Sequence, residues 1–136
     1  MSLREQLVID EGKRNSAYKD SMGYWTIGVG RLIDPSQGGN LSDAEIMMLL
    51  DNDIARSIAD CKKLFPKFST WSQDRQDAVT NMCFNLGAKK LATFTTTVGH
   101  INAGAWEAAQ KSAADSLWYR QVGKRAERII KQMGVS

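Results

Sequence analysis

The sequence predicts an α+β protein in which a short helix and a small antiparallel sheet precede a long helix and a group of further helices. Aromatic and β-branched residues broken by glycines are concentrated in residues 18–32. Apolar residues at helical spacing dominate from residue 42 onward. Because these two signals are segregated along the chain rather than alternating, the fold class is α+β. A length of 136 residues favours a single domain with a substantial core.

The first element is a short helix over residues 3–11. Gly12 is placed to end it through a left-handed cap. Asp10 and Glu11 then lie in its last turn, where the partial negative charge of the helix end disfavours an anion. A carboxylic acid at this position tends to keep its proton, as a proton donor must.

A hairpin and a further short strand are predicted for residues 18–32. Asp20 and Gly23 stand at the first and last positions of a type I turn, which those residue types favour there. Gly28 and Gly30 indicate a bulge or a close approach of other groups to the backbone.

A long helix is predicted from residue 42 to residue 65. Ser42 and Glu45 form a capping box at its start, and Pro66 closes it. Behind the box, apolar residues recur at helical spacing at Ile46, Leu50, Ile54, Ile58 and Cys61.

The rest of the chain is predicted to be helical over residues 72–86, which Gly87 ends, and then over residues 95–102, 105–114 and 124–133. The expected domain therefore comprises a sheet lobe over residues 13–41, a connecting helix over 42–65 and a helical lobe over 66–136. The N-terminal helix is expected to pack near the helical lobe. A cleft between the lobes is the natural place for a ligand.

Composition excludes some classes of protein. With 43% hydrophobic and 24% charged residues, and no apolar run near the roughly twenty residues that span a bilayer, no membrane span is predicted. Cys61 and Cys83 lack metal-ligand spacing and His100 is the only histidine, so we expect no metal and no cofactor. Both cysteines lie on apolar helical stripes and are predicted to be buried free thiols.

The formal net charge of +3 is unevenly distributed. Basic residues crowd the end of the chain at Arg120, Lys124, Arg125, Arg128 and Lys131. This pattern suggests polyanionic surroundings, although a solvated helix face is the alternative interpretation.

Paired carboxylates are the candidate chemistry that the sequence favours. Glycosidic bonds are cut by one carboxylic acid that protonates the leaving oxygen and a second carboxylate that activates water or attacks directly. Glu11 suits the first role, and Asp20, in a polar turn where backbone N–H groups can solvate it, suits the second. A dinucleotide loop at residues 28–30 is rejected because the third glycine is missing. A catalytic triad built on His100 is rejected because no nucleophile elbow is present.

The run IDEGKRNSAYKDSMGYWTIGVGRLI, residues 9–33, resembles the start of the phage-type lysozymes, the endolysin family of glycoside hydrolases. Members carry E-G, then Y-x-D, then G-x-x-T-I-G-x-G, in the order and spacing found here. Later segments also agree: NMCFNLG at 81–87, FTTTV at 94–98 and R-A-x-R at 125–128. The resemblance covers nearly the whole chain and implies a two-lobed lysozyme-like fold.

The resemblance implies that the chain hydrolyses the β-1,4 linkage between N-acetylmuramic acid and N-acetylglucosamine in peptidoglycan, with inversion. Glu11 would be the acid, Asp20 the second carboxylate and Thr26 the residue that helps to hold the attacking water. Inversion implies that the two carboxyl groups are about 6.5 to 9.5 Å apart. Arg125 would reach the catalytic glutamate across the cleft. The implied substrate contacts are Leu32, Phe84, Asn85, Thr97 and Ser112, and for Leu32 and Phe84 core packing is the alternative.

One position departs from the family pattern. Arg31 stands where many members have histidine, so an ion pair made there is expected to be less sensitive to pH near neutrality. Asp53 on the long helix is the expected partner of Arg31.

The resemblance also implies a biological setting. The expected partner is the glycan strand of peptidoglycan, and we expect a monomer that stays in the host cytoplasm until lysis releases it to the cell wall. An export or anchor segment upstream of the first methionine is an open alternative. The alternative functions are a lytic transglycosylase, a non-catalytic wall-binding module and, from the basic end of the chain alone, a nucleic-acid binder.

Overall fold

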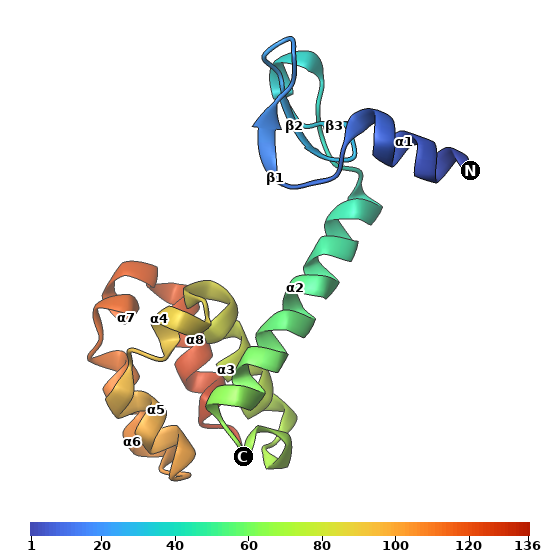
Figure 1. The fold of residues 1–136 in the computed structure, drawn as a ribbon. Helices are drawn as coiled ribbons and strands as arrows, with labels where there is room; N and C mark the ends of the chain where they lie inside the picture. Colours follow the sequence, from blue (N-terminus) through green and yellow to red (C-terminus); the bar gives the residue numbers. More distant parts are fainter. The chain divides into compact units, whose positions relative to one another are not determined.

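The computed structural model describes all 136 residues, which divide into two compact units, Met1–Met48 and Leu49–Ser136. The first unit holds helix α1 (Leu3–Glu11), strands β1 (Arg14–Lys19), β2 (Trp25–Gly28) and β3 (Arg31–Leu32), and a 3₁₀ turn at Pro35–Gln37 (Figure 1). Helix α2 (Asp43–Leu64) begins in this unit and continues into the second. The α+β class is therefore confirmed.

The sheet of the first unit is antiparallel with strand order β1-β2-β3. Its register sets Thr26 opposite Tyr18 on one side and opposite Leu32 on the other. A register shift interrupts the β1–β2 ladder between Arg14 and Tyr18. Strand β1 thus begins four residues before the predicted start, in a stretch whose polar side chains did not indicate a strand.

The second unit is entirely helical apart from its loops. It contains the rest of α2, a 3₁₀ turn at Phe68–Thr70, and helices α3 (Gln73–Leu86), α4 (Ala88–Leu91), α5 (Thr95–Asn102), α6 (Trp106–Ala114), α7 (Leu117–Val122) and α8 (Lys124–Met133). The four helices predicted after Pro66 are confirmed. The short helices α4 and α7 were not predicted, because one or two turns are too short to show periodicity.

The hydrophobic core lies in the second unit. Helix α3 supplies Ala78, Val79, Met82 and Cys83, and α8 supplies Ala126, Ile129 and Met133. Cys61 joins this core from α2, and both cysteines are free and buried as predicted. Four apolar residues of α1, namely Leu3, Leu7, Val8 and Ile9, are exposed. The predicted packing of the N-terminal helix near the helical lobe stays a prediction.

The local signals that the sequence carries at element ends are confirmed in part. Helix α1 ends at Glu11 before Gly12, as predicted, but Gly12 has φ +78° and ψ +163°, so the predicted left-handed helical cap is wrong and glycine is needed there only for its positive φ. The Ser42 hydroxyl accepts a hydrogen bond from the Glu45 backbone N–H, and the Glu45 carboxylate accepts one from the Ser42 N–H, which completes the predicted capping box. None of the helices combines the length and apolar composition needed to cross a bilayer.

Candidate active site

The three predicted catalytic residues all belong to the first unit. Glu11 is the last residue of α1, Asp20 follows β1, and Thr26 lies in β2. The structure therefore places them on three neighbouring elements of one compact unit. The distance between the two carboxyl groups stays a prediction.

Glu11 lies against the tight turn between β2 and β3. A Cβ atom built on Gly30 would be 2.6 Å from Glu11 Oε2 and 2.8 Å from its Cδ, so only a glycine permits this contact. Gly30 also has φ +64°, a conformation that L-residues rarely adopt. The glycine expected from the sequence to allow a close approach thus touches the side chain of the candidate acid.

Asp20 is held by the turn that follows it. Its Oδ1 accepts hydrogen bonds from the backbone N–H groups of Met22 and Tyr24, each 2.9 Å long. The Gly23 N–H donates to the Asp20 carbonyl at 3.0 Å, which closes the predicted turn. Neither side-chain bond uses Oδ2, so that oxygen is available for a water molecule or a substrate.

Thr26 is connected to Asp20 through one carbonyl group. The Tyr24 carbonyl accepts a hydrogen bond from the Asp20 N–H at 2.9 Å and another from the Thr26 hydroxyl at 3.0 Å. Thr26 is 4% exposed, which restricts its side chain further. Because the hydroxyl proton is used on Tyr24, the Thr26 oxygen can interact with a water molecule only as an acceptor.

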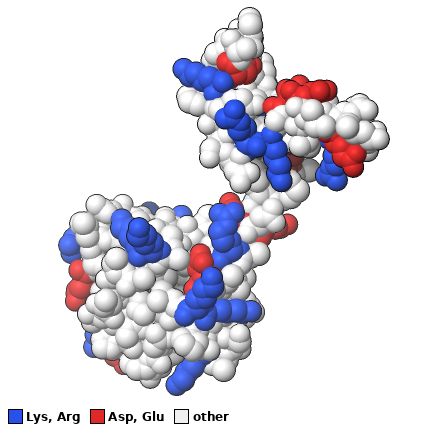
Figure 2. Space-filling model, in the orientation of Figure 1, with Lys and Arg blue, Asp and Glu red and all other residues white.

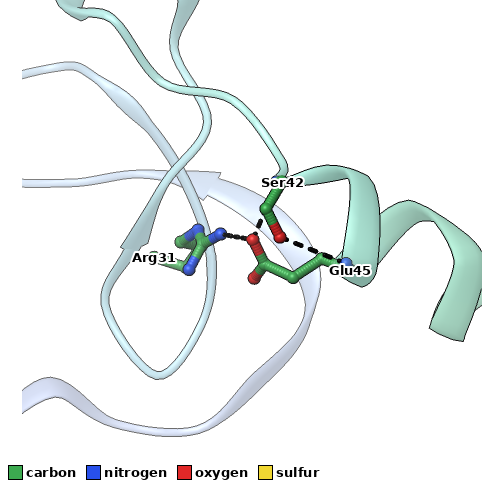
Figure 3. A network of polar contacts seen from close by, with 3 residues as sticks. All are labelled: Arg31, Ser42 and Glu45. Carbon is green, nitrogen blue, oxygen red and sulfur yellow. Dashed lines mark hydrogen bonds and ion pairs between the residues drawn. The ribbon is translucent and has the colours of Figure 1, made fainter.

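Arg31 makes its ion pair with Glu45 within the first unit (Figure 3). The prediction that Arg31 pairs with Asp53 named the wrong partner, since Asp53 pairs with Arg56, three residues further along α2. The sequence predicts only the capping box for Glu45, whereas its Oε1 accepts hydrogen bonds from both the Ser42 backbone and Arg31. These hydrogen bonds, above all those with Ser42, lower the pKa of Glu45.

Two of the predicted site residues in the second unit share a cavity of about 320 Å³. Phe84 is 40% exposed, so it is not completely buried in the core. Arg125 also lines this cavity. The full lining is Leu50, Ile54, Ile58, Asp77, Thr80, Asn81, Phe84 and Arg125. Arg125 donates to Asn81 Oδ1 from Nε at 3.2 Å and from Nη2 at 2.8 Å. Its predicted contact with Glu11 joins the two units and stays a prediction.

The other predicted substrate contacts make hydrogen bonds inside their own units. The Asn85 side-chain oxygen accepts from Trp118 Nε1 at 2.8 Å. The hydroxyls of Thr97 and Ser112 are 2.7 Å apart and link α5 to α6. Leu32 stands beside Thr26 across the β2–β3 ladder. Contact of these residues with a substrate stays a prediction.

Charge on the second unit does not form one continuous patch on the face drawn in Figure 2. Basic side chains lie at separate places on that face, with acidic side chains among them.

Comparison with known proteins identifies one family. The profile described as phage lysozyme matches residues 9–132. The chain is 35% identical to the pre-baseplate central spike protein Gp5 of Enterobacteria phage T4, covering 95% of this chain and 27% of that protein. It is 26% identical to probable T4-type lysozyme 1 of Dictyostelium discoideum, covering 95% of this chain and 91% of that protein. It is also 26% identical to the peptidoglycan hydrolase gp36 of Pseudomonas phage phiKMV, covering 96% of this chain and 15% of that protein. The chain thus spans about a quarter of the T4 spike protein.

Proposed function

Because the chain belongs to the phage lysozyme family, we propose that it is a muramidase that hydrolyses the β-1,4 linkage between N-acetylmuramic acid and N-acetylglucosamine in bacterial peptidoglycan. The observation that carries the proposal is the linked placement of Asp20 and Thr26 on the Tyr24 carbonyl, within the same unit as Glu11. The name of the phiKMV relative, a peptidoglycan hydrolase, supports the same substrate.

In the proposed reaction Glu11 protonates the glycosidic oxygen while a water molecule attacks the anomeric carbon from the opposite face. The water molecule donates one hydrogen bond to Asp20 Oδ2 and a second one to the Thr26 oxygen, which can act only as an acceptor. A lone pair of the water is then directed at the anomeric carbon. Asp20 takes the proton as the bond forms, and the product has the inverted configuration.

The proposed substrate contacts come from both units. Leu32 lies next to Thr26, and Phe84 contributes an exposed aromatic ring beside Arg125. Asn85, Thr97 and Ser112 carry hydrogen-bonding groups that sugar hydroxyls and N-acetyl groups can use. Arg125 is proposed to orient Glu11, since a guanidinium offers a rigid fork of donors.

For the biological role we propose lysis of the host cell, with the chain held in the host cytoplasm as a monomer until it reaches the cell wall. The T4 relative is named as a pre-baseplate central spike protein, and the region similar to this chain is 27% of its length. To test this role, the added protein is assayed for turbidity loss on intact cells and on purified cell wall. Activity on purified wall alone would show that the protein does not reach the wall of an intact cell from outside.

The decisive test replaces Glu11 with Gln and Asp20 with Asn in separate variants, with D10N as the matched control on the same helix end. We expect both site variants to lose turbidity-clearing activity on purified peptidoglycan by at least about a hundredfold, while D10N keeps most of it. Full activity in E11Q would end the assignment of the acid. Retained wall binding by a wild-type chain without any lysis would instead identify a non-catalytic module.

The reaction class is tested by the products. Hydrolysis releases fragments with a free reducing end, whereas a lytic transglycosylase releases an anhydro product that is lighter by one water molecule. Mass analysis separates these two, and NMR of the fresh product reports its anomeric configuration. Immediate appearance of the α-anomer supports inversion, and the β-anomer would contradict the water-holding role of Asp20 and Thr26.

A further inference from the structure

We propose that Glu45, acting through Arg31, is a positioning residue for Glu11. This inference rests on the proposed function, because it assigns Glu11 the role of acid. It concerns a contact path inside the first unit that joins the start of α2 to the turn beneath the Glu11 carboxyl group.

The path begins with a carboxylate whose orientation is fixed. Glu45 Oε1 accepts a hydrogen bond from the Ser42 backbone N–H at 2.9 Å, and the Ser42 hydroxyl accepts one from the Glu45 N–H at 3.2 Å. Figure 3 shows the carboxylate directed at Arg31, whose Nη2 pairs with the same Oε1. The capping box therefore holds Glu45 in the rotamer that meets Arg31.

The path continues through the backbone. Arg31 directly follows Gly30 in the chain and is paired with Ile27 in the β2–β3 ladder. The turn between these strands is thus held by the ladder and by the ion pair of Arg31. Gly30 is the residue of this turn that touches Glu11, and it has no side chain to fill a gap if the turn moves. A shift of the turn would therefore change where the Glu11 carboxyl group rests.

The Arg31–Glu45 ion pair is exposed, so it contributes little to folding stability but can still hold the turn in position. The side chains of Arg31 and Glu45 are 45% and 33% exposed, and exposed ion pairs contribute little to folding free energy. Catalysis is more demanding, because a displacement well below 1 Å at a reacting group lowers the rate while the fold is unchanged. The two effects can thus be separated by experiment.

The test compares E45Q with S42A. Glutamine can still complete a capping box but carries no charge for Arg31. S42A removes only the hydroxyl half of the box, and the backbone N–H of residue 42 still holds the Glu45 carboxylate. We expect E45Q to lower kcat by about three- to tenfold with KM within about twofold and an unchanged melting temperature. S42A should lower the melting temperature and keep kcat.

The pairing is tested by R31M and the double variant R31M/E45Q. If both residues act through one contact, R31M should lower kcat about as much as E45Q, and the double variant should be no worse than either. R31K, which keeps the charge, should retain most of the activity. Additive losses, wild-type kcat in E45Q, or a loss in R31M alone would each overturn the proposal.

Failure of this inference is distinguishable from failure of the proposed function. If E11Q remains active, the acid assignment fails, whatever Glu45 does. If E11Q is inactive while E45Q and R31M behave like the wild type, only the positioning role of Glu45 is wrong.

Discussion

Gly30 lies against the carboxyl group of Glu11, so that a Cβ atom at position 30 would be 2.6 Å from Glu11 Oε2. Gly28, in the same part of the chain, has nearly the same φ, +68° against +64°, but a Cβ atom there would have nothing within 4 Å. The two glycines therefore form a matched pair in which only one contacts the candidate acid.

The first prediction concerns this pair. Both G28A and G30A should destabilise the fold by about 1–2 kcal/mol, because alanine disfavours positive φ. G30A alone should also lower kcat, by at least about tenfold, since the methyl group displaces the Glu11 carboxyl group. Urea unfolding and initial rates on purified peptidoglycan measure the two effects. Equal activity of the two variants would show that the Gly30 contact has no part in catalysis.

The second prediction concerns the Thr26 hydroxyl. T26V keeps the shape but removes the oxygen, and the Tyr24 carbonyl remains hydrogen-bonded by the Asp20 N–H. Stability should therefore change by less than about 1 kcal/mol, while kcat should fall by at least about tenfold because the water loses its second acceptor. T26S, which restores the oxygen without the methyl group, should fall between T26V and the wild type. A fully active T26V would remove Thr26 from the mechanism.

The third prediction concerns Asp34, whose side chain joins β2 to the 3₁₀ turn. Its Oδ1 accepts from the Ser36 hydroxyl and backbone N–H, and its Oδ2 accepts from the Trp25 N–H at 3.1 Å. The Ser36 hydroxyl bond and then the Trp25 bond lower the pKa of Asp34 below its ordinary value of 3.8. A lowered folded-state pKa means that the ionised form stabilises the fold above that ordinary value.

This stabilisation must disappear as pH falls through the lowered pKa. The wild type should therefore exceed D34N in urea midpoint at about pH 6 and lose that advantage as the pH falls below 3.8 and through the lowered pKa of Asp34. Urea titrations of both proteins at several pH values measure the difference. An advantage that is constant over this range would show that the Asp34 charge does not contribute.

The fourth prediction concerns Asn85 and Trp118. Trp118 is 4% exposed and its Nε1–H donates to Asn85 Oδ1. N85A should lower the free energy of unfolding by about 1 kcal/mol because the indole N–H loses its acceptor, whereas N85D keeps an acceptor and should lose less. Denaturant unfolding of the three proteins tests this. If N85A also raises KM while N85D does not, the amide acts on the substrate through its oxygen.

Much of the first unit could be predicted from the sequence because its signals are local. The end of α1 at Glu11, the turn after Asp20 and the Ser42–Glu45 capping box each depend on hydrogen bonds between residues two to four positions apart. Such bonds require particular residue types at fixed spacing, so the spacing itself reveals them. The family motifs then indicated which of these local features carry the proposed chemistry.

Contacts between elements could not be predicted in the same way. The spacing of residues along the chain does not indicate that Glu45 forms an ion pair with Arg31, fourteen positions away. It also does not indicate that Arg125 donates a hydrogen bond to Asn81, forty-four positions away. Both pairings depend on how separate elements pack, and several carboxylates were equally suitable partners for Arg31 on charge alone. The residue types and local turns were thus determined by the sequence itself. Which side chains meet, and that Gly30 touches Glu11, was decided only by tertiary packing, because only the folded chain brings distant residues within hydrogen-bonding and van der Waals range.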